Sequence, residues 1–581
     1  MQETRSPPIV LSALPVVRSR PARILFLTSA AATAGILLWA QYYVGSYGSI
    51  YLARIFYLLF ITLDCQAAAA LLLILIAAAL LPDRTGSRTL LRWIGTHPGG
   101  IAFGTGLVLC AGTLLVYQNH PLAMDEYAQL FQSQVFASGH LTGHFPPALL
   151  DWLVPHYFQN MFLSVSHSSG AVASGYWPSF ALLLTPFTLV GASWACNAAV
   201  SALTLVVVHR LALRMFGDVE AAGLAVLFTL ASPVFFANGI SYYSMPAHLL
   251  ANALFALLLL DPTGRRALLA GFIGSIALTL HNPVPHILFA VPWLIVVARR
   301  PDGPRLLGHL VIGYIPLCLL LGFGWFWFTG ELRHVDIPAA TGAAATSGGL
   351  SGMWKTLAVF AMPTWGVWLA RLIGLAKICL WAVPVLPVLA AAGAWKWRHH
   401  TPSRLFVASA LLTLVGYLLL PVDQGHGWGY RYFHSAWMAL PLLAAGAFTG
   451  TPAPVRRAGL FENEDARSFG VTCALLTLVF GVGFRAVQIH DFISDDLHQV
   501  PAYSGTERRI VIIDPSPSFY GWDLVQNDPW LRGDAVRMIT NGAAADAAMM
   551  RAHFPGLHKV YFDQFGSVWS DAPQQLPRAA R

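Results

Sequence analysis

Long apolar runs follow one another through most of this sequence. A helix needs about 20 mostly apolar residues to cross the hydrocarbon core of a bilayer. Thirteen runs approach or exceed that length, at residues 24–44, 55–81, 101–118, 192–213, 218–237, 243–260, 266–281, 284–299, 305–328, 371–397, 403–421, 433–450 and 468–487. Only 11% of the 581 residues are charged, whereas about a quarter are charged in soluble domains. The sequence therefore predicts an α-helical polytopic membrane protein with about 13 transmembrane helices.

Basic residues are concentrated at alternate connections between these runs. One set of connections carries Arg18, Arg20, Arg23, Arg84, Arg88, Arg92, Arg210, Arg214, Arg265, Arg266, Arg299, Arg300, Arg305, Lys396, Arg398, Arg404, Arg456, Arg457 and Arg467. Before the tail, the other set carries Arg54, Arg333, Lys355, Arg371, Arg431 and Arg485. Because Lys and Arg are enriched in cytoplasmic loops, we predict a cytoplasmic N-terminus and an extracytoplasmic C-terminus. The net charge of +8 then reflects topology and does not indicate nucleic-acid binding.

The chain is expected to divide into three parts. These are residues 1–100, with the first two spans; 101–487, a membrane domain whose first outer loop covers 119–191; and a tail, 488–581. The first loop shows helical spacing at 125–138, and an apolar segment at 176–190 is expected to lie in the membrane interface. The tail is predicted to be a small extracytoplasmic α/β unit, with strands at 509–514, 534–539 and 559–562 and a helix at 543–553.

Two adjacent carboxylates, Asp125 and Glu126, open the first outer loop. From Trp93 to His209 there is no Lys or Arg, and the only other acid is Asp151. A carboxylate pair at the membrane–water boundary is where a membrane enzyme would place a general base. The simpler interpretation is that both acids offset the dipole at a helix N-terminus.

Several short motifs, in this order and on this side, resemble the GT-C glycosyltransferases that use polyprenyl-phosphate sugars. Within that class the chain is similar to the protein O-mannosyltransferase-like family, which includes the lipid A aminoarabinose transferases. The resemblance covers roughly residues 100–560. Its motifs are Asp125-Glu126 with the helix Tyr127–Leu141, Ser174–Pro178, Ala231–Pro233, Ser244–His248, Gly429–Phe433, Asn527–Pro529 and Phe554–Gly556. Two features depart from the family pattern: Tyr-Trp-Pro-Ser at 176–179 replaces a Tyr-Pro-Pro-Gly-like stretch, and the first two spans are an N-terminal addition.

The resemblance implies roles for individual residues. Asp125 would take the proton from an acceptor hydroxyl, and Glu126 would orient the site or help to hold a divalent metal. The leaving lipid phosphate needs cations, and Arg431 is the first candidate because its guanidinium binds phosphate with two parallel hydrogen bonds. The alternative for Arg431 is a side chain that snorkels to the interface. Arg371 and Lys377 are further donor-phosphate candidates, but six residues apart they do not share a helix face.

Other polar residues are candidates for lining the site or for a separate role. The site-lining candidates are Tyr127, Tyr176, His248, His426, Tyr430 and Tyr432. The histidines suit phosphate or metal binding, but no pair has clear ligand spacing and there is no CxxC motif, so no metal ligand is assigned. All six cysteines fall inside spans, so no disulfide framework is implied. Asp64, inside the second span, is either functional or bonded to a neighbouring helix.

The expected function is that of a membrane glycosyltransferase. It would move a sugar from a polyprenyl-phosphate donor to a glycan, lipid or protein acceptor at the periplasmic face of a bacterial inner membrane, and the resemblance implies inversion at the anomeric carbon. An O-antigen ligase or polymerase remains an alternative, although its large loop usually lies late in the chain. A lipid-linked substrate transporter and a scaffold with a degenerate site also remain open.

Overall fold

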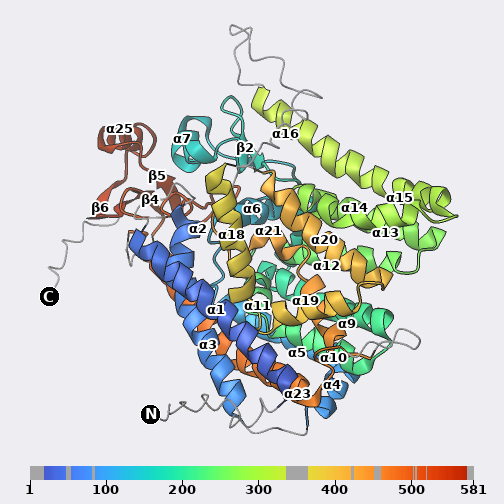
Figure 1. The fold of residues 1–581 in the computed structure, drawn as a ribbon. Coiled ribbons are helices and arrows are strands. Elements are labelled where there is room, and N and C mark those ends of the chain that lie inside the picture. Colours follow the sequence, from blue (N-terminus) through green and yellow to red (C-terminus); the bar gives the residue numbers. More distant parts are fainter. Residues whose placement is uncertain are drawn as a thin grey trace, which may run out of the picture.

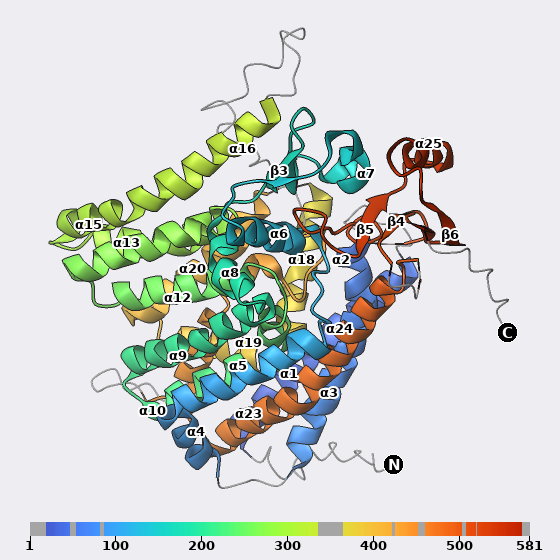
Figure 2. The same cartoon turned by 180° about the vertical axis from the view of Figure 1, so that it is seen from behind.

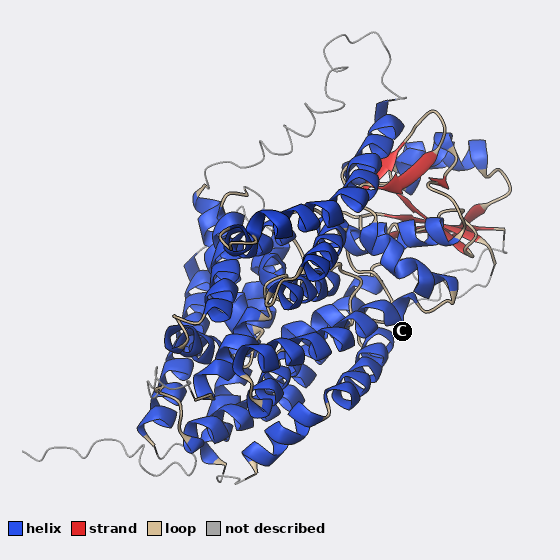
Figure 3. Cartoon of the chain, turned by 90° about the vertical axis from the view of Figure 1, so that its right-hand side faces the viewer, coloured by secondary structure: helices blue, strands red, loops and turns tan. Residues whose placement is uncertain are grey.

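The computed structural model describes residues 19–46, 54–81, 86–334, 364–420, 424–450, 459–501, 503, 507–518 and 520–571. Arg18, Arg84, Lys355, Arg456 and Arg457, which entered the prediction of orientation, lie outside these ranges. Within them, a large helical body carries two small sheets at one end (Figures 1 and 2). Figure 3 shows the strands gathered at one corner of the molecule. We call this end of the body the loop end.

Helices occupy all thirteen predicted runs. The body consists of α1 (Arg20–Ser46), α2 (Arg54–Leu59), α3 (Cys65–Leu80), α4 (Ser87–Thr96), α5 (Pro98–Leu115), α9 (Cys196–Phe216), α10 (Val219–Leu230), α11 (Pro233–Gly239), α12 (Met245–Leu259), α13 (Gly264–Thr279), α14 (Val284–Ala298), α15 (Gly303–Leu317), α16 (Trp325–His334), α18 (Trp365–Leu380), α19 (Leu386–Lys396), α20 (Thr401–Leu418), α21 (Arg431–His434), α22 (Ala439–Phe448), α23 (Glu464–Leu476) and α24 (Val482–Leu497). Short π-helical segments join neighbours at η2 (Phe60–Asp64), η6 (Cys318–Gly324) and η7 (Thr477–Gly481). The predicted class, a polytopic helical protein, is confirmed.

Fewer helices than thirteen are long and apolar enough to cross a membrane alone. Of the described helices seven meet that test by length and composition, or eight if α10 and α11 form one span. Those two are bent by 63° at the break before Pro233, where the proline ring removes a hydrogen bond and disfavours helix in the residue before it. The predicted run at 371–397 is likewise two helices, α18 and α19, because the chain leaves the helix around Pro384.

Two sheets lie at the loop end. In the first loop, β1 (Gly143–His144), β3 (Ala171–Ser174) and β2 (Leu163–Val165) pair antiparallel in that order. The tail sheet has the order β5 (Ala535–Ile539), β4 (Arg509–Ile513), β7 (Gly566–Ser570), β6 (His558–Asp563), with only β4 and β5 parallel. Helix α25 (Ala543–His553) follows β5. The three predicted tail strands and the helix are therefore confirmed, whereas β7 was not predicted.

The first loop and the tail share one hydrophobic core. The loop also contains α6 (Met124–Ala137), α7 (Leu150–Leu153) and α8 (Ser179–Leu189). Phe131 of α6 and Leu150 of α7 pack in one buried cluster with Ile512 and Met538 of the tail sheet. Hydrogen bonds cross the same interface, including one from the Trp152 indole to Asp546 at 2.9 Å. The tail is therefore part of the structure that holds α6 in place.

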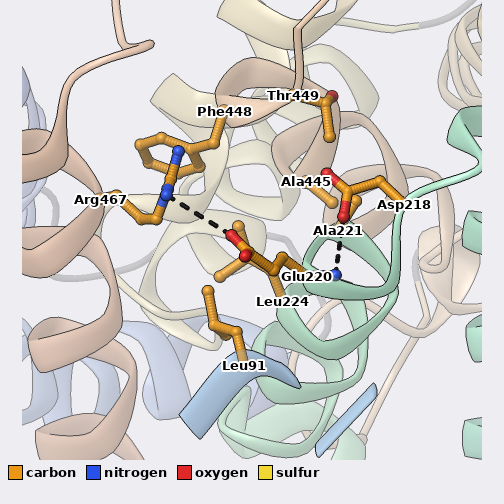
Figure 4. A pocket seen from close by; sticks show the side chains of 9 residues that line it. All are labelled: Leu91, Asp218, Glu220, Ala221, Leu224, Ala445, Phe448, Thr449 and Arg467. Carbon is orange, nitrogen blue, oxygen red and sulfur yellow. Dashed lines mark hydrogen bonds and ion pairs between the residues drawn. The ribbon is translucent and has the colours of Figure 1, made fainter. Parts of the chain in front are cut away.

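Charged residues at the opposite end of the body connect α4, α10 and α23. Arg92 Nε lies 2.8 Å from Glu220 Oε1, and Arg467 Nη1 lies 3.6 Å from Glu220 Oε2. A small cavity lies beside them, lined by side chains of α4, α10, α22 and α23 (Figure 4). The polar groups that line it bond to one another. For example, the Glu220 N–H donates to Asp218 Oδ1 at 2.8 Å. We therefore place no chemistry there.

Candidate functional site

Helix α6 places the two predicted carboxylates at its first turn. Its N-terminus is fixed from the tail, because the Met124 N–H donates to Asp523 Oδ1 at 2.7 Å. Asp125 and Glu126 are neighbours in the helix, so their side chains leave it about 100° apart. The acids thus do lie at a helix N-terminus, where negative charge is stabilised, and each also has specific partners.

Asp125 forms an ion pair with Arg431, which is 306 positions away in the sequence. Arg431 Nη1 donates to Asp125 Oδ2 at 2.7 Å, and the side chains are 8% and 18% exposed, respectively. Helix α21, which begins at Arg431, therefore meets the first turn of α6. This brings together the predicted general base and the first predicted phosphate ligand.

The loop before α21 holds Arg431 in one orientation. The Arg431 N–H donates to Gln424 Oε1 at 2.8 Å, and its Nη2 donates to the Gln424 carbonyl oxygen. The guanidinium lies 4.5 Å from the centre of the Tyr243 ring, a cation–π contact. Gly427, with φ +152°, leaves the necessary room, since a Cβ there would lie 2.4 Å from Arg431 Cδ. Arg431 Nε is buried and has no hydrogen-bond partner among the described residues.

Tyr176 and His281 complete the surroundings of Asp125. The Tyr176 hydroxyl donates to Asp125 Oδ1. The Tyr176 ring stacks on the His281 ring, with centroids 4.1 Å apart and planes at 30°. Tyr176 comes from the stretch just before α8 and His281 from the connection between α13 and α14. The stretch at 176–179 departs from the expected pattern at Trp177 and Ser179, but it retains the tyrosine whose hydroxyl meets the carboxylate.

These neighbours set the charge states in the site. Burial acts to raise the pKa of Asp125, but the Arg431 guanidinium, His281 and the hydrogen bonds from Tyr176 and Arg431 together hold that pKa below its usual value. Burial and the Asp125 charge raise the pKa of Tyr176, so its hydroxyl remains protonated. Burial lowers the pKa of His281 to about 4, although Asp125 opposes the change. At neutral pH the site therefore presents a carboxylate, a guanidinium, a neutral imidazole and a phenol.

Glu126 points away from this pair and into a set of donors. It is fully buried and accepts hydrogen bonds from the Tyr117 hydroxyl at 3.0 Å and from the Tyr242 N–H at 2.8 Å. The N–H groups of Leu122 and Ala123 also donate to it, at 2.9 and 3.3 Å. Burial raises the pKa of Glu126 to about 7 against these bonds. Of the two roles suggested by the resemblance, these contacts fit the one in which Glu126 orients the site.

Glu126→Gln is expected to destabilise the protein by about 1–3 kcal/mol. Above the pKa of about 7, where Glu126 is ionised, all four partners donate to it, so the amide NH₂ of Gln would face another donor and leave a buried N–H or O–H unpaired. The measurement is the midpoint of denaturant unfolding in detergent. Asp151→Asn is the control, because Asp151 is an exposed acid of the same loop. Equal midpoints for the two variants would contradict the assignment.

The other predicted tyrosines and Arg371 lie beside the pair or hold the tail. The Tyr127 hydroxyl donates to the Asn527 carbonyl oxygen at 2.5 Å, so this residue anchors α6 to the tail. Arg371 donates to the carbonyl oxygens of Tyr417 and Leu420, each at 2.9 Å. Its guanidinium lies 5.0 Å from the centre of the Tyr432 ring. Tyr430, which precedes Arg431, packs its ring against Gly374 of α18.

Lys377 has its contacts elsewhere. Its Nζ forms an ion pair with Asp64, and it lies 5.0 Å from the centre of the Phe56 ring. The structure therefore groups Lys377 with the first two spans, and among the described residues it contacts neither Asp125 nor Arg431. For Asp64, this is the bond to a neighbouring helix that the sequence left open.

The two predicted histidines differ in their partners. His426 Nδ1 is 3.0 Å from the Tyr243 hydroxyl, so it supports the tyrosine on which Arg431 rests. His248, in the first turn of α12, is fully buried, and neither ring nitrogen has a partner among the described residues. In the described part of the chain, no group of three or more His, Cys, Asp or Glu side chains is arranged to hold a metal ion.

Three residues of the site were not singled out from the sequence. Tyr243 directly precedes the motif at Ser244–His248, and Gln424 lies in the connection before Gly429–Phe433. His281 follows α13, in the connection to α14. Tyr243 and His281 contact Arg431 and Tyr176, which lie more than 100 residues away in the sequence, so no local pattern marks them. Gln424 bonds to Arg431 only seven residues away, but it lies outside the motifs.

Comparisons with known proteins find similarity only among solved structures. No protein-family model matches the chain, and no curated protein matches it. ArnT from Cupriavidus metallidurans bound to undecaprenyl phosphate is similar, with a TM-score of 0.48 and 13% sequence identity over 82% of this chain and 99% of that chain. The same protein in the apo state has a TM-score of 0.46 at 13% identity, over 81% of this chain and 97% of that chain.

Proposed function

We propose that this protein is an integral membrane glycosyltransferase of the GT-C class. It transfers a sugar from a polyprenyl-phosphate donor to an acceptor hydroxyl, with inversion at the anomeric carbon. The site lies at the loop end, which we assign to the periplasmic face of a bacterial inner membrane from the distribution of Lys and Arg. Residues 101–487 are the catalytic membrane domain and 488–581 the periplasmic domain.

The observation that carries the proposal is the Asp125–Arg431 ion pair. A carboxylate and a guanidinium in contact, both largely buried and both at the end of the body that carries the long loop, supply the two groups that this transfer needs. The carboxylate is ionised at neutral pH and so can accept a proton. The guanidinium stabilises negative charge on a leaving phosphate.

The reaction assigns one task to each group. The acceptor oxygen attacks the anomeric carbon from the face opposite the lipid phosphate and gives its proton to Asp125. The bond between the anomeric carbon and the phosphate oxygen breaks, and its electron pair remains on the phosphate, next to Arg431. Tyr176 holds Asp125 through its hydroxyl, and Glu126 fixes the turn that carries Asp125. Arg371, Tyr430 and Tyr432 are proposed to line the approach to Arg431.

The transporter alternative has less support. It would use charged residues deep within spans, such as Asp64 and Lys377. Both are committed to one buried ion cluster with Arg485. An O-antigen ligase would place its reacting loop late in the chain, whereas the carboxylate here comes from the first long loop.

The test is native mass spectrometry of the purified protein, followed by a transfer assay. We expect a polyprenyl phosphate or its glycosyl form to co-purify, and added polyprenyl-phosphate sugars to be consumed in the presence of membrane acceptors. Asp125→Asn should retain the lipid and lose the transfer. Bulk phospholipid alone, even after polyprenyl-phosphate sugars are added, would overturn the proposal.

A further inference from the structure

Three charged side chains meet in the interior, next to the site but outside it. Asp64 of η2 contacts Lys377 of α18 through its Oδ2, and its Oδ1 lies 2.8 Å from Arg485 Nη2 of α24. Their side chains are 1%, 1% and 2% exposed, respectively. Such charges are costly inside a membrane protein unless they are paired, and one carboxylate here serves two cations.

Trp381 connects this cluster to the loop that carries Arg431. Its indole Nε1 donates to Asp64 Oδ1 at 2.7 Å, and the Arg485 guanidinium lies 3.9 Å from the centre of its ring. The indole is therefore held at its edge by the carboxylate and on its face by the guanidinium. The backbone carbonyl oxygen of Trp381 accepts a hydrogen bond from the Val234 N–H at 3.1 Å, which fixes the backbone as well.

The other side of Trp381 supports the loop that carries Arg431. Gly429, with φ +72°, packs between Val234 and the base of the indole, since a Cβ there would lie 2.8 Å from Val234 Cγ2 and 3.4 Å from Trp381 Cγ. The neighbouring Trp428 ring is 6.1 Å from the Trp381 ring. Trp428 Nε1 donates to the Tyr117 hydroxyl at 3.2 Å, and that hydroxyl donates to Glu126. One set of contacts thus joins Trp381 to Gly429, two residues before Arg431. A second set runs through Trp428 and Tyr117 to Glu126, in the turn that carries Asp125.

We propose that Asp64 is a positioning residue for Arg431 and acts through the Trp381 indole. The N-terminal helices α1 to α3 then contribute to the site, because they supply the carboxylate that orients the loop carrying Arg431. For catalysis the inference rests on the proposed function. For the position of the loop it rests only on the contacts from Asp64 to Gly429.

The test compares Asp64→Asn with Asp64→Leu in the full-length protein. The two replacements are close in size and remove the same charge, so both leave Lys377 and Arg485 without a counter-charge. Only Asn retains an oxygen that accepts the Trp381 N–H. We expect amide exchange over residues 424–431 to be up to about tenfold faster in Asp64→Leu than in Asp64→Asn, the factor for one hydrogen bond. We expect kcat of Asp64→Leu to be lower than that of Asp64→Asn by a similar factor, with the same KM for the acceptor in both variants.

A second pair of variants decides the question if neither Asp64 variant folds. Trp381→Phe removes the indole donor and leaves the three charged side chains of the ion cluster in place. Trp293→Phe is its matched control, because Trp293 is also buried and donates to Ser409 at 3.1 Å, away from the site. Faster exchange over 424–431 in Trp381→Phe alone supports the proposal. Equal exchange in the two Trp variants, or in the two Asp64 variants, overturns it. Exchange needs no substrate, so a wild-type protein without transfer would refute the proposed function and leave this test intact.

Discussion

Asp125→Asn is expected to lower kcat about 10²- to 10⁴-fold, the usual contribution of a general base. The two bonds to Asp125 reach different oxygens, so the single amide oxygen of Asn can accept from Arg431 or from Tyr176, and it takes no proton at neutral pH. Arg431 also loses its counter-charge and is freer to bind a phosphate. The expected result is therefore a large loss in kcat without a rise in KM for the polyprenyl-phosphate donor, measured by initial rates of sugar transfer in detergent or nanodiscs.

Asp151→Asn is the matched control for that variant. Asp151 is the third acid of the first loop, is exposed, and accepts a hydrogen bond from Gln159 at 3.1 Å. It should keep wild-type kcat and KM. An Asp125→Asn enzyme with more than about a tenth of wild-type kcat would show that Asp125 is not the base, since general bases contribute at least about 10²-fold.

The sequence predicted the elements whose residues are close together in the chain. The helix after Asp125, the apolar runs and the strands at Arg509–Ile513 and Ala535–Ile539 all have a local period or composition that identifies them. Strand β7 was not predicted because it is five residues long and contains a glycine and two serines, which lack strand propensity. It is a strand because it pairs with β4 on one side and β6 on the other.

Contacts between distant segments could not be predicted from one sequence. Asp125 and Arg431 were both singled out, but nothing in their local surroundings shows that they touch. Lys377 and Asp64 were assigned separately, to phosphate binding and to an undetermined role, whereas they form one ion pair 313 positions apart. Charge inside a span indicates that a partner exists, and the packing of helices decides which residue it is.

Arg431→Gln is expected to impair both stability and activity. It leaves the Asp125 carboxylate buried without a cation, which typically costs about 3–5 kcal/mol. It also removes the proposed phosphate ligand, so KM for the donor should rise. Arg431→Lys keeps the charge but lacks the planar fork, and should fall between the wild type and Arg431→Gln in both properties. Unfolding midpoints and donor titrations of the three proteins measure these effects.

The pH profile of these variants tests the coupling between the two groups. In the wild type Arg431 depresses the pKa of Asp125, so the stability that the pair adds is complete above the ordinary pKa near 4 and is lost as pH falls through the lower folded value. In Arg431→Gln only Tyr176 and His281 still oppose burial, so the pKa of Asp125 rises and the protonated acid is favoured. The acid limb of the kcat/KM profile should then move to higher pH, because only ionised Asp125 is a base.

The double variant Asp125→Asn/Arg431→Gln separates a mutual ion pair from two independent residues. If the carboxylate and the guanidinium stabilise each other, removing both charges leaves neither uncompensated. The double variant should then be more stable than Arg431→Gln alone, although it has lost one more native side chain. It should remain inactive, because it has neither a base nor a phosphate ligand. Additive losses of stability would mean that the two side chains are held independently. Asp125 and Arg431 would then have to be assigned their roles one at a time.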